Sequence, residues 1–222
     1  KKPIAKTGFR FKSVECSLSD INYRMPQNHY TIRIKNLLIN SNSHVFRVDS
    51  LRIIQQNNNI KFGENKTHQI NLTEATATKI EITKFDVLRL IEGLGRDKYS
   101  SRNDRDSSSI FLDNLDMHLT QHDNGLQLHH SFYFKHVAGT GINFVKAIFN
   151  YSIFINSLNF EQSEIKVDRS LLNKETSQPG ILPRLNIPFK NISINKLNLS
   201  EAKVWLHSDK GEQMLLKGDL VI

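Results

Sequence analysis

The chain of 222 residues has one cysteine and no run of 18 apolar residues. A single cysteine cannot form a disulfide within the chain, so no internal disulfide framework stabilises it. Without a long apolar run, we expect no segment of the sequence to span a membrane as a helix. Cys16 occupies an apolar position of a strand-like pattern, which predicts a buried thiol that packs as a small hydrophobic group.

Signatures of catalysis are also missing. The sequence has no Gly-x-Ser-x-Gly motif, and Gly139-Thr140-Gly141 lacks the further Gly and Lys of a phosphate-binding loop. Glu161 and Glu164 have the chemistry of an acid–base pair, but nothing distinguishes them from exposed carboxylates of a strand. We therefore expect a protein that is not an enzyme and that uses no cofactor.

Five of the nine histidines lie between His118 and His136, which raises the question of a metal site. His118 and His122 share one face of a predicted strand, but they are four residues, or roughly 13 Å, apart along it. A zinc ion holds each ligand at about 2 Å, so one ion cannot bind both imidazoles. We expect solvated histidines on a strand and no metal site.

Basic residues exceed acidic ones, and the net charge is +8. Such a charge favours anionic partners such as lipid head groups, lipopolysaccharide or nucleic acid. Lys35, Arg47 and Arg52, however, lie between apolar neighbours, as expected of the outward positions of strands. The longest basic clusters are Lys1-Lys2 and residues 96–105, and neither resembles a nucleic-acid-binding arm, so we expect no nucleic-acid partner.

What the sequence does contain is one recurring apolar pattern, such as Ile32-x-Ile34-x-x-Leu37-x-Ile39. Eight copies, the sixth incomplete, begin at Phe9, Ile32, Phe46, Ile80, Ile110, Phe132, Ile153 and Ile192. Alternate residues of a strand share a face, so the two-residue gap in each copy moves its second half to the opposite face. Either a β-bulge keeps both halves inside, or the strand bends and crosses between two layers.

These patterns predict an all-β fold with at most one or two short helices. The strands would surround one elongated apolar interior, as an antiparallel sheet or a two-layer sandwich. Residues 84–94 also fit helical spacing and are the strongest candidate for a helix. We expect strands at 8–18, 30–39, 45–55, 60–62, 148–160, 163–167, 185–199, 202–207 and 213–222, besides the Ile80-x-Ile82 segment and the hairpin described next.

Asn124-Gly125 is the clearest local signal, because Asn-Gly between alternating residues predicts a two-residue type I′ hairpin turn. The turn sets a register in which Leu119 pairs with His130 and Met117 pairs with Phe132. One face then holds Leu115, Met117, Leu119, Leu126, Leu128 and Phe132, and the other holds His118, Thr120, His122, Gln127, His129 and Ser131. The sorting predicts one buried face and one solvated face. Asp209-Lys210-Gly211 predicts a second hairpin turn.

We expect residues 1–222 to form a single β-rich domain, because the irregular spacing of the copies argues against a solenoid. The polar segment 96–109 is expected to be a mobile loop, and residues 174–188 a loop that contains proline. The chain begins with Lys and ends on the strand-like run Leu220-Val221-Ile222. We therefore expect it to be a piece of a longer protein.

Three passages resemble the strand repeats of AsmA-like proteins: residues 46–53, residues 192–204, and residues 86–91 leading to 110–115. The resemblance covers most of the chain through short, degenerate motifs. It implies a relationship to AsmA-like and TamB-like proteins, which are anchored in the bacterial inner membrane and extend into the periplasm. It further implies a long, curved β-sheet with an apolar groove, and a part in moving phospholipids or maintaining the outer membrane. The chain departs from that group in lacking a membrane anchor and great length.

The sequence thus predicts a periplasmic module of the bacterial envelope that binds phospholipid or another acyl lipid along an apolar face. Envelope proteins are further expected partners, and the anchor to the inner membrane is expected outside this chain. The candidate lipid-contact residues are Ile32, Ile34, Ile153, Ile155, Ile192 and Ile194, which an ordinary sandwich core would equally explain. The alternative function is a closed β-sandwich that binds a protein or a glycan through loops such as 96–109.

Overall fold

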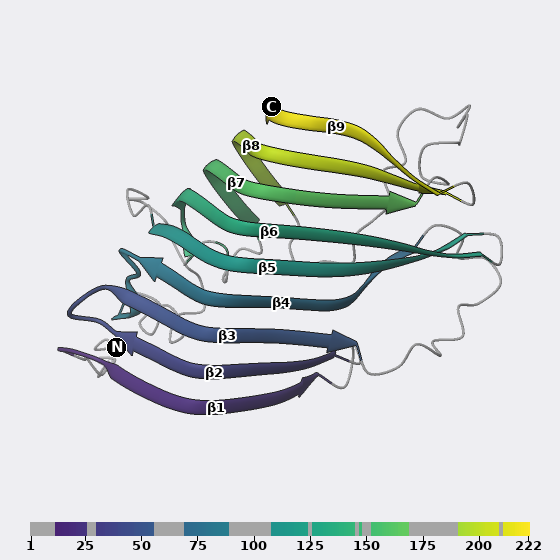
Figure 1. The fold of residues 1–222 in the computed structure, drawn as a ribbon. Coiled ribbons are helices and arrows are strands. Elements are labelled where there is room, and N and C mark those ends of the chain that lie inside the picture. Colours follow the sequence, from purple (N-terminus) through teal and green to yellow (C-terminus); the bar gives the residue numbers. More distant parts are fainter. Residues whose placement is uncertain are drawn as a thin grey trace, which may run out of the picture.

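A computed structural model of the chain describes residues 12–25, 30–55, 69–88, 108–123, 126–144, 147, 152–168, 191–208 and 211–222. These residues form one sheet of nine strands, which lie side by side in the order of the sequence (Figure 1). The strands are β1 (Glu15–Met25), β2 (Tyr30–Asn40), β3 (Val45–Gln55), β4 (Gln69–Thr83), β5 (Ser108–Asp123), β6 (Leu126–Ile142), β7 (Ser152–Asp168), β8 (Asn191–Ser208) and β9 (Gly211–Val221).

The predicted all-β, elongated and curved architecture is confirmed, and all the described strands belong to a single layer. Neighbouring strands run antiparallel, with one exception: β7 and β8 run parallel. The expectation of a purely antiparallel sheet is therefore wrong at this pair. The apolar pattern of a strand reads the same in either direction, so the sequence did not distinguish the two pairings.

Several strands bend where the two-residue gap of the pattern falls. Positive φ angles occur at seven described residues other than glycine: Asn36, His44, Lys79, Lys84, Asn114, Gln162 and Glu201. Three of these, Asn36, Lys84 and Asn114, are the second residue of a gap. Lys79, Gln162 and Glu201 lie just outside a copy, before Ile80 and after Phe160 and Leu199. A residue in the left-handed conformation bends the strand and interrupts the alternation of side chains at that point, so residues before and after it can face the same way. The gap is therefore a local bend within one sheet and not a crossing between two layers.

Packing shows that both halves of a copy stay on one face. Leu37 and Ile34 flank the gap in β2, and Val48 and Leu51 flank the gap in β3, yet all four belong to one apolar cluster. The cluster also includes Ala77 and Ile80, on either side of the bend at Lys79 in β4. Side chains on the two sides of a bend converge only on its concave side, so the apolar face is the concave face.

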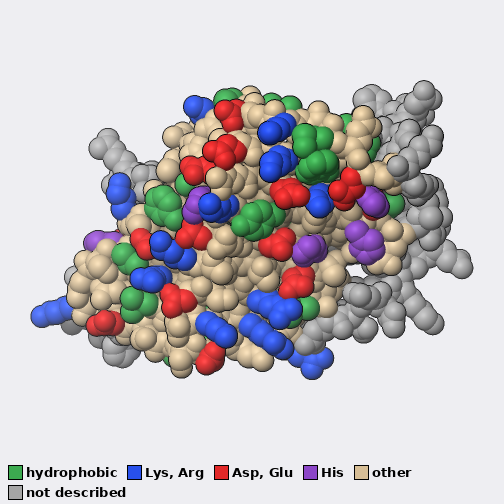
Figure 2. Space-filling view, in the orientation of Figure 1, with side chains coloured by type: hydrophobic (Ala, Val, Ile, Leu, Met, Phe, Trp, Pro, Cys, Tyr) green, Lys and Arg blue, Asp and Glu red, His purple; other side chains and the backbone are tan. Residues whose placement is uncertain are grey.

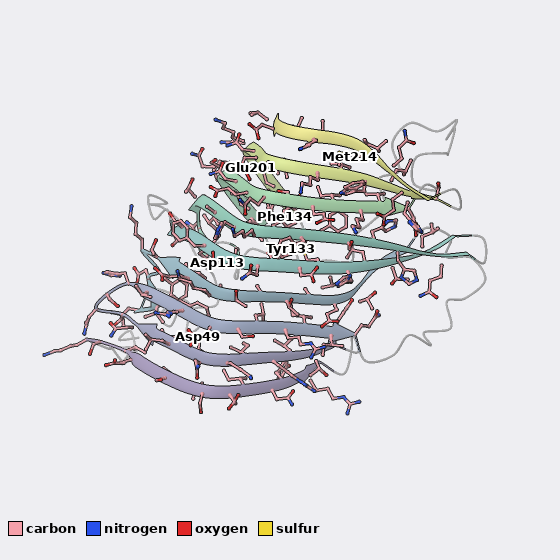
Figure 3. All side chains as sticks on the ribbon, viewed as in Figure 1. Asp49, Asp113, Tyr133, Phe134, Glu201 and Met214 are labelled. Carbon is pink, nitrogen blue, oxygen red and sulfur yellow. The ribbon has the colours of Figure 1, made fainter. Side chains whose placement is uncertain are left out.

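The bends of neighbouring strands align into a line across the sheet, which we call the first crease. It comprises Asn36, Asp49, Lys79, Asn114, Lys135, Gln162 and Glu201, one from each strand from β2 to β8. Lys35 pairs with Ser50 and Leu37 pairs with Val48, so Asn36 lies opposite Asp49 without a change of register. In Figure 3, Asp49, Asp113 and Glu201 lie in a line across the sheet.

A second crease crosses the strands at a distance of one apolar-x-apolar segment from the first. It comprises His44, Lys84, Gly141, Asn156 and Asn195. The backbone N–H of Phe85 donates to the carbonyl of His44, the Ser108 hydroxyl donates to the carbonyl of Lys84, and Asn195 Nδ2 donates to Asn156 Oδ1. Gly141 has φ +72°, and a side chain there would overlap Asn156 Cβ. The first parts of β7 and β8 accordingly turn back behind the rest of the sheet (Figure 1).

The two creases shape the sheet into a trough. Its long wall lies beyond the first crease, its floor lies between the creases, and its short wall lies beyond the second crease. A second apolar cluster joins floor to short wall, because Ile82 on the floor packs with Phe85 and Val87 beyond the second crease. The concave, apolar surface of the trough is thus continuous from one wall to the other.

The predicted hairpin register is confirmed: Leu119 pairs with His130, and Met117 pairs with Phe132. The turn residues Asn124 and Gly125 themselves lie outside the described residues. Ser208 pairs with Gly211, so the second predicted hairpin is also present between β8 and β9.

Other expectations need correction. The predicted strands 148–160 and 163–167 are one strand, β7, and 185–199 and 202–207 are one strand, β8. Gln162 and Glu201 bend these strands at the first crease without ending them, because one residue in the left-handed conformation bends a strand but does not reverse it. Cys16, expected to be buried, is half-exposed.

Parts of three further predictions lie outside the described residues. These are the strand at 60–62, the proline-containing loop 174–188 and most of the loop 96–109. Ser108 and Ser109, the last residues of that loop, belong to β5. Within the candidate helix 84–94, Val87 and Leu88 are helical, and the segment beyond them is not described. No helix in the described part of the chain is long and apolar enough to span a membrane.

Candidate functional site

The candidate residues Ile32 and Ile34 lie on the long wall of the trough, in β2. Both side chains are half-buried, and Ile34 packs against the cluster formed by Leu37, Val48 and their neighbours. Ile32 pairs with Ile53 of β3 and Tyr23 of β1, so the apolar surface continues toward the ends of these strands.

The other four candidates lie together on the short wall. Ile153 pairs with Ile192, and Ile155 pairs with Ile194, through the parallel register of β7 and β8. Ile153 and Ile155 are half-buried, whereas Ile192 and Ile194 are 47% and 37% exposed. The structure thus brings these four isoleucines into one patch and leaves Ile32 and Ile34 on the opposite wall, five strands away.

Exposed apolar side chains continue onto β9, which the sequence prediction had not singled out. Leu216 pairs with Val204, and Leu220 pairs with Leu199, so both extend the apolar face of β8. Each is 38% exposed, and Met214 is 41% exposed. Alternation in 213–222 was recognisable in the sequence, but only the sheet order shows that it prolongs the same face.

Four polar side chains of the described long wall are buried, Thr31, Thr120, His130 and Ser163, and one of them, His130, carries a titratable group. His130 is 2% exposed, and its Nδ1 accepts a hydrogen bond from the backbone N–H of Asp168 at 3.2 Å. Its Nε2 has no hydrogen-bond partner among the described residues. Burial lowers the pKa of His130; the Asp168 carboxylate opposes this effect and His129 adds to it. The strand alternation places His130 on the apolar face with Phe132, a signal that the sequence prediction missed.

The convex face is rich in charged side chains, with some exposed hydrophobic side chains among them (Figure 2). Figure 2 shows Lys, Arg, Asp, Glu and His side chains interspersed across this face. Asp113, beside the first crease, contacts His136 Nδ1 at 2.8 Å and Lys79 Nζ at 3.8 Å. The Tyr133 hydroxyl donates to Asn114 Oδ1 at 3.0 Å, and Asn114 Nδ2 donates to Thr78 Oγ1 at 3.0 Å. These bonds link β4, β5 and β6 across the first crease and therefore hold its bend.

No three His, Cys, Asp or Glu side chains of the described residues are grouped so as to hold a metal ion. Glu164 lies 3.5 Å from Lys166 Nζ, and Glu161 lies opposite His136 in the register. The two glutamates are thus on opposite sides of the first crease. What the arrangement offers chemically is a long apolar surface with few polar atoms.

Comparisons with known proteins add no relative to this picture. The chain matches no protein-family model, no curated protein and no solved structure.

Proposed function

We propose that the trough binds the acyl chains of a phospholipid or another lipid, without catalysing a reaction. The observation that carries this proposal is the continuous apolar face on the concave side of one bent sheet, which is buried at its centre and exposed on the short wall. No second layer of strands covers that surface in the described part of the chain. Ile192 and Ile194 on the short wall expose apolar atoms that an acyl chain would remove from water.

The free energy gained by burying methylene groups determines how long a bound acyl chain must be. Burying one methylene contributes about 0.8 kcal/mol, so ten methylenes contribute about 8 kcal/mol. Association costs an estimated 4–15 kcal/mol in lost freedom of motion, which a short chain does not offset. The trough should therefore favour long acyl chains, and affinity should rise steeply with chain length.

The proposed setting is the periplasm of a bacterial envelope, with an inner-membrane anchor outside this chain. It is supported by the resemblance of the strand repeats to those of AsmA-like proteins and by the single curved sheet with an apolar groove that this resemblance implies. In this setting the protein would hold or transfer phospholipid, with envelope proteins as further partners. The alternative, a closed β-sandwich that binds a protein or a glycan, requires a second packed sheet, which the described strands do not form.

Native mass spectrometry of the gently purified protein tests the proposal. We expect co-purifying lipid, and we expect Ile194→Asp to reduce it, because a carboxylate on the short wall opposes acyl binding. Ser193→Asp is the matched control, since Ser193 is the exposed neighbour on the other face of β8. A lipid-free wild type that also takes up no added long-chain phospholipid would refute the proposal, as would equal lipid loss in both variants.

A further inference from the structure

The described arginines are confined to the three strands at one edge of the sheet. The four arginines that the structure describes, Arg24, Arg33, Arg47 and Arg52, all lie on β1–β3, and all are exposed. The other positive side chains of the described strands are lysines and histidines dispersed among carboxylates (Figure 2). Lys and Arg side chains gather at the lower edge of the face in Figure 2, where β1–β3 lie in Figure 1.

Three of these arginines form a cluster on the convex face. Arg33 of β2 lies directly opposite Arg52 of β3. Asn22 lies opposite Arg33 on the other side, which places Arg24, two residues further along β1, diagonal to Arg33. Like charges directly opposite one another in a sheet are destabilising, so the folded protein alone does not benefit from this arrangement.

Only part of this charge is neutralised by the protein. Arg52 Nε contacts Glu74 Oε1 at 2.7 Å, and both side chains are partly exposed. Arg33 forms no ion pair with any residue that the structure describes. Its cross-strand neighbours Asn22 and Arg52 supply no acid. The Arg33 guanidinium is therefore available to an external anion.

The cluster also adjoins an end of the trough. Arg24 is the penultimate residue of β1, and Arg33 and Arg52 each lie three residues from an end of β2 or β3. Ile32 and Ile53 occupy the inner face beside these arginines. Tyr23, next to Arg24, is 57% exposed at the edge strand. An exposed tyrosine beside basic side chains is typical of protein surfaces that contact the head-group layer of a membrane.

We propose that Arg24, Arg33 and Arg52 dock this end of the long wall onto an anionic phospholipid surface. This proposal rests on the proposed function, because such docking brings the trough to its lipid. The planar guanidinium fork matches the oxygens of a lipid phosphate, and its positive charge favours an anionic surface. A nucleic acid fits less well, because the outer-face neighbours of the cluster are Asn22, Thr31 and Thr76, which offer no ring for base stacking.

Co-sedimentation with vesicles tests the docking. We expect the protein to bind vesicles of phosphatidylcholine with phosphatidylglycerol more strongly than vesicles of phosphatidylcholine alone. Each Arg→Gln change should weaken this binding about fivefold, which corresponds to about 1 kcal/mol per basic residue near an anionic surface. The triple variant Arg24→Gln/Arg33→Gln/Arg52→Gln is compared with Lys135→Gln/Lys196→Gln/Lys203→Gln, which removes the same charge from exposed positions elsewhere. Equal losses in both variants, or no preference for the anionic vesicles, would overturn the proposal.

Two further measurements distinguish a failure of the docking proposal from unfolding and from a failure of the proposed function. Arg33→Gln should not lower the thermal midpoint, because it removes a like-charge pair, so a weakened vesicle binding cannot then be assigned to unfolding. Native mass spectrometry of the arginine triple variant should still show co-purifying lipid, since the trough is intact. Lipid in the trough without arginine-dependent docking refutes the docking alone. Arginine-dependent docking of a protein whose trough takes up no lipid refutes the proposed function instead.

Discussion

Asn36 and Asp49 face each other across β2 and β3, and Asn36 Nδ2 donates a hydrogen bond to Asp49 Oδ2 at 3.0 Å. Asn36 has φ +52°, so the bond lies at the bend itself. Asp49 also contacts Arg47 Nε at 3.4 Å. A side-chain bond thus ties two bent strands together at the first crease, on the convex side, while apolar packing holds them on the concave side.

Asp49→Ala should lower the free energy of unfolding by about 0.5–1.5 kcal/mol, because it removes the bond to Asn36 and leaves that amide to water. Chemical denaturation measures the change. Ser50→Ala, at the adjacent position of the same strand, is the control and should change the stability by less than about 0.5 kcal/mol. Comparable losses for the two variants would show that the Asn36–Asp49 bond does not stabilise the bend.

Substitutions of Lys79 test the backbone conformation at the first crease. Its φ is +50°, a conformation that costs residues with a Cβ roughly 1–2 kcal/mol and β-branched residues more. Lys79→Val and Lys79→Gly both lose the weak contact with Asp113, so their difference isolates the backbone. We expect the Val variant to be less stable than the Gly variant by about 1–2 kcal/mol in denaturant titrations.

Lys135 is the matched control for this experiment, because it lies on the same crease without a positive φ. At an ordinary strand position Val is favoured over Gly, so Lys135→Val should be at least as stable as Lys135→Gly. The order of the two variants should therefore reverse between Lys79 and Lys135. The same order at both positions would contradict a left-handed residue at Lys79.

His130 should make stability depend on pH. Burial holds its pKa below the ordinary 6.5, so the unfolded chain binds a proton at higher pH than the folded one. This contribution to stability is complete above about pH 6.5 and is lost as the pH falls through the lowered pKa of the folded state. Thermal midpoints measured from pH 7.5 down to pH 5 should therefore fall less steeply for His130→Leu than for the wild type.

His118→Leu is the comparison, because His118 is an exposed histidine on the convex face of the neighbouring strand. It should leave most of the pH dependence in place. Identical slopes for His130→Leu and the wild type would mean that the buried imidazole does not govern acid stability. His130→Leu also removes the acceptor for the Asp168 N–H, so its stability at pH 7.5 needs to be measured alongside.

Much of the architecture was predictable because local patterns report local geometry. The register of β5 and β6 followed from Asn124-Gly125, since a two-residue turn leaves only one pairing of the flanking residues. What the sequence did not predict also has a physical reason. Whether Gln162 and Glu201 ended a strand or bent it depended on whether neighbouring strands bend at the same level, and a single strand carries no such information.

The candidate site shows the same division. Ile153, Ile155, Ile192 and Ile194 were identified as apolar strand residues, but the parallel register that pairs them joins segments separated by more than twenty residues. His130 and the apolar residues of β9 were overlooked, although alternation already placed them. Whether lipid occupies the surface these residues form remains a prediction for the experiments above.

The order of residues alone determined the all-β class, the positions of most strands and the two-residue gap in each copy, because period-two alternation and turn residues act within a few positions. The tertiary structure decided that the strands bend within one layer, that the bends align into two creases and that the apolar halves meet inside a trough. Alignment requires backbone hydrogen bonds between neighbouring strands, and a bend at Asn36 persists only where Asp49 and Lys79 bend beside it.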